Sequence, residues 1–227
     1  MNQTLTPERR YTDTAPVEDH HSYTVARIKA DALIGKRSTD KTLAHRFSKA
    51  DASENLIDHE KAWDPNKLII SQTDLRGTIT YCNDIFSEMS GWSREELLGS
   101  NHNLIRHPDM PQVAFKLAWD LLKAGREFYG YVKNLRKDGS FYWVFAYITP
   151  DIDEKGEVYG YTSYRRYAPK LAVDAMTPVY KLLIKAEKEG GMEASEALLN
   201  GYLSDNGFTS YGSFIVDLQI KANASES

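Results

Sequence analysis

The chain has 227 residues, of which 41% are hydrophobic and 26% are charged, a composition typical of a protein with a packed core. Its formal net charge of −4 argues against general nucleic-acid binding. The single cysteine, Cys82, excludes an internal disulfide framework and a cysteine-based zinc cluster within one chain, and it fits a reducing compartment. We find no apolar secretory signal and no stretch approaching the ~20 apolar residues that cross a bilayer. We therefore expect a cytoplasmic protein without direct membrane insertion, which would reach the inner membrane only by recruitment to a partner.

Residues 1–66 are interpreted as a polar N-terminal extension. We expect residues 1–22 to be a mobile tail, because they are rich in Thr, Glu, Asp and His. Residues 22–60 have weak helical character, interrupted at Gly35 and Ser38. This segment would be helical only when packed on a partner or a second subunit.

The hydrophobic pattern sharpens after this extension. Residues 68–73 and 78–82 predict two short strands joined by a turn. Asn83 is placed to cap a short helix that ends before Gly91, and a capping box over residues 93–96 predicts a second short helix.

A longer amphipathic helix is predicted between the cluster Arg106-His107-Pro108-Asp109 and Gly125. Asp109 is the expected N-cap, and Gln112 completes a capping-box-like pattern. Arg106 and His107 then stand just before a helix N-terminus, whose free N–H groups and partial positive charge suit an anion such as phosphate. Either side chain could instead cap the helix or form an ion pair with a neighbour.

After Gly125 the apolar period changes from about 3.6 to about 2. Residues 127–135, 140–149 and 158–167 predict three consecutive antiparallel strands, the first two joined by a hairpin turn. With the two earlier strands they predict an α+β domain over residues 67–168, built on one five-stranded antiparallel sheet.

Aromatic side chains concentrate in these three strands. One interpretation is a sheet covered by helices on one face and by a partner or flanking segment on the other. The alternative is a pocket for a flat ring system, with Asn83, Asn134 and the tyrosines as polar groups. Both interpretations stay open on the residues alone.

Residues 169–227 predict a C-terminal helical extension. Pro178 is expected to kink or divide its first helix, and a further helical pair is expected around Asn206-Gly207. The apolar residues of this extension are typical of an interface rather than a site. The terminal residues 222–227 are expected to be frayed.

Three motifs carry a resemblance to a known family. They are N-D-x-F at residues 83–86, H-N-x-[IV]-R-H-P-D-M-P at 102–111 and V-K-N-x-R-K-x-G-x-x-Y-W-V at 132–144, with Trp119 in the helix between the last two. Over residues 68–190 the chain resembles PAS sensor domains of the bacterial aerotaxis-receptor type. The resemblance implies the PAS fold, non-covalently bound FAD, and a signal in aerotaxis or chemotaxis that depends on the redox state of the flavin.

The resemblance also implies a set of FAD-binding residues: Arg106, His107, Asp109, Asn83, Trp119, Asn134 and Trp143. In this set Arg106 would meet the diphosphate or adenine, and His107 would stack on the nucleotide or hydrogen-bond to it. Asp109 would cap the helix and orient its neighbours. The family's receptor carries a membrane anchor, a HAMP module and a long signalling helix, none of which we expect here. We therefore expect a homodimer that signals through contact with a partner protein, such as a chemoreceptor or another regulator.

The sequence also bears on other classes of PAS domain and on enzymes. A light-oxygen-voltage variant of the fold needs a cysteine in the motif G-x-N-C-R-F-L-Q, and His102 occupies that position, which excludes cysteinyl-flavin photochemistry there. A heme-binding PAS gas sensor would use His102 or His107 as axial ligand. A PAS domain without a ligand would serve as a dimerisation or interaction module. We do not expect an enzyme, because the sequence contains no nucleophile elbow, P-loop, zinc-protease, kinase or cyclase motif.

Overall fold

The computed structural model describes residues 55–225. The expectations for residues 1–54, which are most of the N-terminal extension, lie outside these residues. None of the helices in residues 55–225 has the length and apolar content needed to cross a bilayer.

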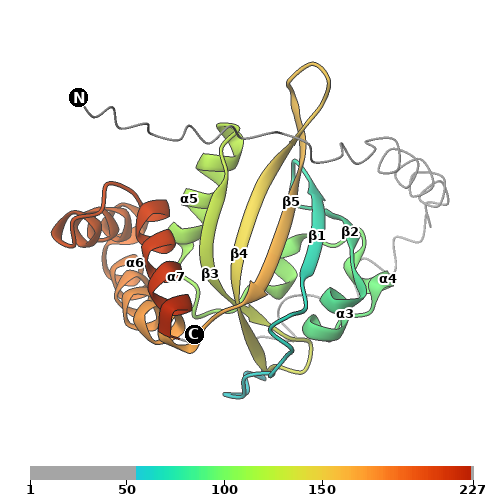
Figure 1. Cartoon of the computed structure of the whole chain (residues 1–227), viewed down its shortest axis with the longest axis horizontal. Helices are drawn as coiled ribbons and strands as arrows, with labels where there is room; N and C mark the ends of the chain where they lie inside the picture. Colours follow the sequence, from blue (N-terminus) through green and yellow to red (C-terminus); the bar gives the residue numbers. More distant parts are fainter. Residues whose placement is uncertain (1–54, 226–227) are drawn as a thin grey trace, which may run out of the picture. The chain divides into compact units, whose positions relative to one another are not determined.

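A single antiparallel sheet forms the centre of the described chain (Figure 1). Its strands are β1 (Ile69–Asp74), β2 (Ile79–Cys82), β3 (Phe128–Leu135), β4 (Phe141–Ile152) and β5 (Val158–Tyr167), in the spatial order β2-β1-β5-β4-β3. The last strand of the β3–β4–β5 meander thus lies in the middle of the sheet and pairs with β1. The predicted α+β class with five antiparallel strands is confirmed.

Short helices follow β2 where the capping residues predicted them. Helix α3 (Asp84–Ser90) begins after Asn83, whose side-chain oxygen accepts from the N–H of Phe86, and it ends at Gly91 in the left-handed conformation, with φ 74°. Helix α4 (Arg94–Leu97) has the predicted capping box. A 3₁₀ helix, η1 (His102–Ile105), follows. Helices α3 and α4 lie at the β1–β2 side of the sheet (Figure 1).

Helix α5 (Gln112–Lys123) begins two residues later than an Asp109 N-cap requires, so that part of the prediction is wrong. The N-cap position is held by Pro111, which has no side-chain acceptor. The Asp109 carboxylate instead forms an ion pair with Lys133 of β3, at 2.7 Å. The first turn of α5 is capped from a distant part of the chain, because Glu187 Oε1 accepts from the N–H of Val113 at 2.8 Å.

The C-terminal residues form helices α6 (Lys170–Asp205) and α7 (Tyr211–Ser225). Pro178 was expected to kink or divide the first of these. It does not divide the helix, because the only non-helical backbone inside α6 lies at Gly191, with φ 73° and ψ −169°. Glycine adopts this conformation without a Cβ penalty, so the chain turns there. Helix α7 continues to Ser225, whereas fraying was expected from residue 222.

The C-terminal helices share a hydrophobic core with the sheet. The Tyr180 ring of α6 stacks on Trp143 of β4 with centroids 6.3 Å apart, and its hydroxyl donates to the Tyr131 carbonyl of β3 at 2.7 Å. From α7, the Tyr211 hydroxyl lies 2.8 Å from that of Tyr180. The apolar residues of this extension, which were predicted to form an interface, therefore pack on the sheet of the same chain. The boundary at residues 168/169 stays an expectation.

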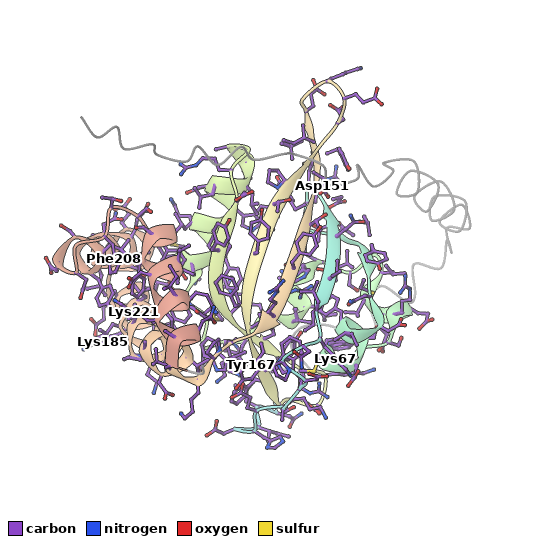
Figure 2. All side chains as sticks on the ribbon, viewed as in Figure 1. Lys67, Asp151, Tyr167, Lys185, Phe208 and Lys221 are labelled. Atoms are coloured by element: carbon purple, nitrogen blue, oxygen red, sulfur yellow. The ribbon has the colours of Figure 1, made fainter. Side chains whose placement is uncertain are left out.

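The residues before β1 also pack on the sheet. Glu60 forms a parallel bridge with Phe141 at the start of β4. The Trp63 ring lies 6.5 Å from that of Tyr167, which Figure 2 shows at the end of β5. The residues before β1 therefore contact the start of β4 and the end of β5.

Replacing Glu187 by glutamine tests the cap that joins α6 to α5. The variant keeps the shape of the side chain but loses the negative charge at the helix N-terminus, so we expect a free energy of unfolding lower by about 1 kcal/mol in urea titrations. Glu189→Gln is the matched control, because Glu189 is exposed on the same helix and its closest partner is Lys185, at 3.8 Å. Equal losses in both variants would contradict the assignment.

Candidate functional site

A cavity of about 630 Å³ lies between one face of the sheet and the segment from η1 to α5. Its sheet side is formed by alternate residues of β4 and β5, including Ala146, Ile148, Tyr161, Ser163 and Arg165. The residues between them, such as Tyr147 and Tyr164, face the opposite side of the sheet and line a different hollow. The volume falls in the range of about 300–1,000 Å³ that small-molecule sites occupy.

Three of the residues predicted for FAD line this cavity: Arg106, Trp119 and Asn134. The Arg106 guanidinium lies over the Phe115 ring at 4.2 Å and donates to the Met110 carbonyl at 3.2 Å. Burial lowers the pKa of Arg106, against the opposing effect of the Glu187 carboxylate. The Trp119 indole meets Tyr161 edge to face, with centroids 5.5 Å apart. Arg106 is thus a half-buried cation at the wall of the cavity.

Asn134 supplies a buried donor. Its backbone bridges to that of Arg106, which holds β3 against the segment after η1. The residue is 3% exposed, and its Nδ2 has no hydrogen-bond partner among residues 55–225. A buried amide without a partner costs about 1–3 kcal/mol, so a ligand with an acceptor group would relieve this cost.

The remaining predicted residues do not line the cavity. The Asn83 side chain accepts from the N–H groups of Ile70 and Phe86 and donates to the Leu68 carbonyl, so its polar atoms are engaged within the protein. The Trp143 ring faces α6 instead, in the contact with Tyr180 described above.

His107 and Asp109 also lie outside the cavity lining. His107 Nδ1 accepts from the N–H of Asp109 at 3.1 Å, and its ring meets Phe141 edge to face. Burial, together with the charge of Lys133, lowers the pKa of His107 to about 4. Its imidazole is therefore neutral at pH 7, which fits a turn residue that organises the chain before α5.

Arg165 is a cavity residue that the sequence analysis did not single out. It lies on β5, is 2% exposed, and donates through Nη2 to the Ser71 hydroxyl of β1. Its Nε and Nη1 have no hydrogen-bond partner among the described residues. Strand periodicity could have indicated it, because every second residue of a strand lies on the same face and Tyr161, Ser163 and Arg165 are spaced in this way.

No carboxylate forms an ion pair with Arg165 within residues 55–225. The guanidinium lies 4.3 Å over the Phe86 ring, a cation–π contact worth up to about 2 kcal/mol when desolvated. Burying an unpaired ion costs several kcal/mol, so this contact does not offset the cost. Burial lowers the pKa of Arg165 to about 10, which leaves the side chain positively charged at pH 7.

His102 stands beside this charge. Its ring stacks on Phe86, with centroids 5.6 Å apart, and its Nε2 lies 3.2 Å from the Ser71 hydroxyl. Because that hydroxyl accepts from Arg165, its own proton is available to Nε2 of His102. Desolvation, followed by the charge of Arg165, lowers the pKa of His102 to about 3. At this part of the cavity wall a cation, Arg165, therefore lies beside a neutral imidazole.

The arrangement favours a flat ligand with acceptor groups over a metal. Within residues 55–225 no group of three or more His, Cys, Asp or Glu side chains gathers as a metal site. His102 borders the cavity, which is compatible with an axial heme ligand, but its Nε2 is engaged by Ser71.

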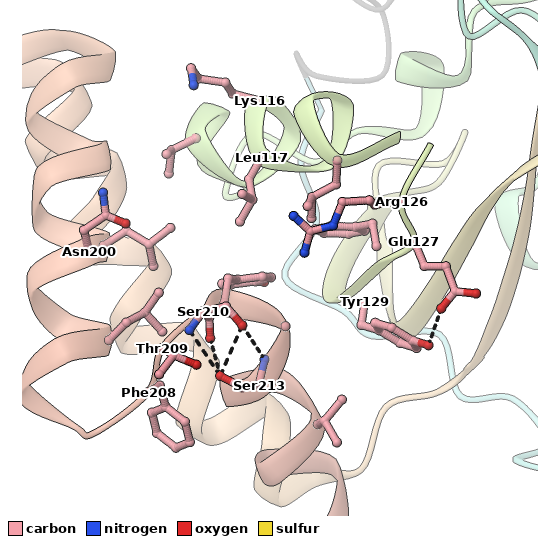
Figure 3. A pocket seen from close by; sticks show the side chains of 18 of the residues that line it. Lys116, Leu117, Arg126, Glu127, Tyr129, Asn200, Phe208, Thr209, Ser210 and Ser213 are labelled. Carbon is pink, nitrogen blue, oxygen red and sulfur yellow. Dashed lines mark hydrogen bonds between the residues drawn. The ribbon is translucent and has the colours of Figure 1, made fainter. Parts of the chain in front are cut away.

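A second hollow, of about 960 Å³, lies outside the sheet between α5, α6 and α7 (Figure 3). Figure 3 shows Leu117 and Arg126 projecting into it opposite the turn that holds Ser210 and Ser213. These two serines hydrogen-bond each other, and Glu127 accepts from Tyr129. Several polar groups of this groove are thus partnered within the chain.

Comparisons with known proteins agree with the fold. Residues 79–165 match the family model described as the PAS fold. The aerotaxis receptor of Escherichia coli (strain K12) is 45% identical over 115 residues, which are 51% of this chain and 22% of the receptor. The nitrogen fixation regulatory protein of Klebsiella pneumoniae is 33% identical over 97 residues, which are 43% of this chain and 20% of that protein. The chain thus spans about a fifth of the length of these relatives.

Solved structures also resemble part of the chain. A light-oxygen-voltage domain studied with a flavin analogue is 24% identical, with a TM-score of 0.44, and the match covers 49% of this chain and 83% of that one. A PAS domain of a protein from Colwellia psychrerythraea is 24% identical, with a TM-score of 0.39, over 44% of this chain and 86% of that one.

Proposed function

We propose that the protein is a cytoplasmic redox sensor. The proposal starts from the PAS domain at residues 79–165, which is related to that of the aerotaxis receptor. The protein binds FAD non-covalently in the cavity between the sheet and α5 and passes the signal to a partner protein. The observation that carries the proposal is a pair of buried donors in the cavity wall, on Asn134 and Arg165, that have no hydrogen-bond partner among residues 55–225. The isoalloxazine ring of a flavin is flat and carries carbonyl and ring-nitrogen acceptors, so its chemistry complements these donors.

The protein's side chains have distinct tasks in this proposal. Asn134 and Arg165 bind and orient the ring through hydrogen bonds, while Trp119 and Tyr161 contribute aromatic surface. Arg106 faces the cavity from the segment before α5 and meets the negatively charged diphosphate. The flavin, when bound, supplies reversible uptake of electrons.

The position of the cavity suggests how the signal leaves the site. The strands that line it, β4 and β5, also carry the outer face of the sheet, and β4 contacts α6 through Trp143 and Tyr180. A change in hydrogen bonding at Asn134 or Arg165 would bias the packing between sheet and helices if that contact has two arrangements. The proposed receiver is a chemoreceptor-like protein or another regulator, and the proposed sensor is a homodimer.

The visible absorption spectrum of the purified protein, before and after addition of dithionite, tests the proposal. Two flavin bands that bleach on reduction, with FAD released on heating, are expected. An intense Soret band would favour heme at His102 instead. A colourless protein that does not take up added FAD would contradict both and leave an interaction module.

Replacement of Arg106 by alanine tests the nucleotide side of the site. We expect FAD to bind on the order of tenfold more weakly, because a charged hydrogen-bond donor to the diphosphate is lost. Titration of the apoprotein with FAD, followed by flavin fluorescence, measures the change. Arg126→Ala is the matched control, since Arg126 is an exposed arginine in the outer groove. An equal loss in the control would show that the effect is general electrostatics rather than a contact.

A further inference from the structure

Arg165 is a buried cation in the cavity wall, and no residue of the described part of the chain supplies a counter-charge. It is 2% exposed, and two of its three nitrogens lack a partner within the described chain. The groups around it are Ser71, Phe86, His102, Tyr142 and Cys82. None of these is an acid that is ionised at pH 7.

Such an arrangement stabilises a negatively charged ligand more than a neutral one. The side chain is held from two sides, by the hydrogen bond to Ser71 and by the Phe86 ring. These two contacts fix the positions of its free Nε and Nη1. A charge that is positioned before a ligand arrives needs no reorganisation when negative charge develops nearby. In a desolvated site its effect is much larger than in water.

We infer that Arg165 sets the midpoint potential of the bound flavin, because it favours the anionic reduced form over the neutral oxidised form. This inference rests on the proposed function. Uptake of two electrons and one proton leaves the ring with one negative charge, and a low-potential electron carrier supplies the electrons. Arg165 compensates that charge, so the protein binds the reduced form more tightly and the midpoint potential of the flavin rises.

Arg165 also connects the ligand to the sheet. Through Ser71 it reaches β1, and the Ser71 hydroxyl meets His102 of η1. In the sheet Arg165 pairs with Ile69 of β1 and Ala146 of β4. A ligand that changes its charge therefore acts on a residue that joins the three central strands.

The experiment compares Arg165→Met, Arg165→Lys and Arg166→Met with the wild-type chain of 227 residues. The midpoint potential of bound FAD is measured by reduction in equilibrium with a dye of known potential. In Arg165→Met we expect the preference for the reduced form to fall at least tenfold, a decrease of about 30 mV for a two-electron couple. Arg165→Lys keeps the charge and should stay close to wild type.

Arg166→Met is the matched control, because Arg166 is the next residue of β5, is exposed and faces the opposite side of the sheet. It removes the same charge and should leave the potential unchanged. A second readout needs no flavin. Removal of an unpaired buried charge should raise the melting temperature of the apoprotein in Arg165→Met and leave it unchanged in Arg166→Met.

The outcomes separate the inference from the proposed function. Failure of the wild-type protein to bind FAD would overturn both. Normal FAD binding with the same potential in Arg165→Met and wild type would overturn only the role of Arg165. A lower potential in both Arg165→Met and Arg166→Met would likewise reject it, because the effect would then follow from net charge.

Discussion

Replacement of Tyr180 by alanine is expected to lower the free energy of unfolding of the protein by about 3–5 kcal/mol, as for other large-to-small changes in aromatic cores. Tyr180 is 2% exposed. Its ring covers Trp143, and its hydroxyl joins the Tyr131 carbonyl to the Tyr211 hydroxyl. One side chain thus connects α6, α7 and two strands.

Two further variants separate the contributions of ring and hydroxyl. Tyr180→Phe keeps the ring but leaves the Tyr131 carbonyl and the Tyr211 hydroxyl without this partner, which should cost about 1–3 kcal/mol. Leu182→Ala, two residues along the same helix and 54% exposed, should change stability by less than about 0.5 kcal/mol. Urea unfolding followed by circular dichroism measures all three.

The number of transitions is informative. A shared core predicts a single cooperative transition that shifts to lower urea concentration in Tyr180→Ala. Two separate transitions, of which only one moves, would contradict a common core for the sheet and the C-terminal helices.

Local signals explain why the sheet and the first helices were predictable. The Asn83 cap, the Ser93–Glu96 capping box and the left-handed glycine at Gly91 are each decided by residues within one turn of chain. The alternation of apolar and polar residues along each strand is also a local pattern, and the meander pairs strands that are consecutive in the sequence.

The errors occurred where distant residues compete with local ones. Asp109 is a good N-cap by type, but Lys133 binds its carboxylate and Glu187 caps the helix from α6. The free N–H groups expected to attract phosphate are therefore partly engaged by a carboxylate of the protein itself. Pro178 does not divide α6, which continues through it, and the chain turns at Gly191 instead.

The candidate site was only partly visible in the sequence. The motifs led to Arg106, Trp119 and Asn134, which line the cavity. They gave no indication of Arg165, whose environment depends on β1, α3 and η1 meeting at one point. A buried charge without a counter-charge becomes evident only when the neighbours of every polar atom are known.

Ala146 is the position at which a single change should remove FAD binding without harm to the fold. This residue is 2% exposed and lies on the sheet side of the cavity, between Gly130 of β3 and Arg165 of β5 in the register of the strands. The small methyl group leaves the space above β4 open. Phenylalanine at this position would project its ring into the volume that the proposed ligand needs.

We expect Ala146→Phe to weaken FAD binding by at least about a hundredfold, a loss of about 2.8 kcal/mol in binding free energy. The melting temperature of the apoprotein should stay the same or rise, because the added ring buries apolar surface in an existing cavity rather than in a packed core. Flavin fluorescence and thermal unfolding without FAD measure the two quantities on the same samples.

Tyr147→Trp is the matched control, since Tyr147 is the next residue of β4 and faces the hollow on the other side of the sheet. It adds volume to the strand outside the cavity, so FAD affinity should remain that of wild type. Wild-type affinity in Ala146→Phe would mean that FAD binds elsewhere, for which the groove between α5, α6 and α7 is one candidate. Weak binding in Ala146→Phe combined with a lower melting temperature would indicate overpacking instead, and would contradict the open space that the cavity provides at this position.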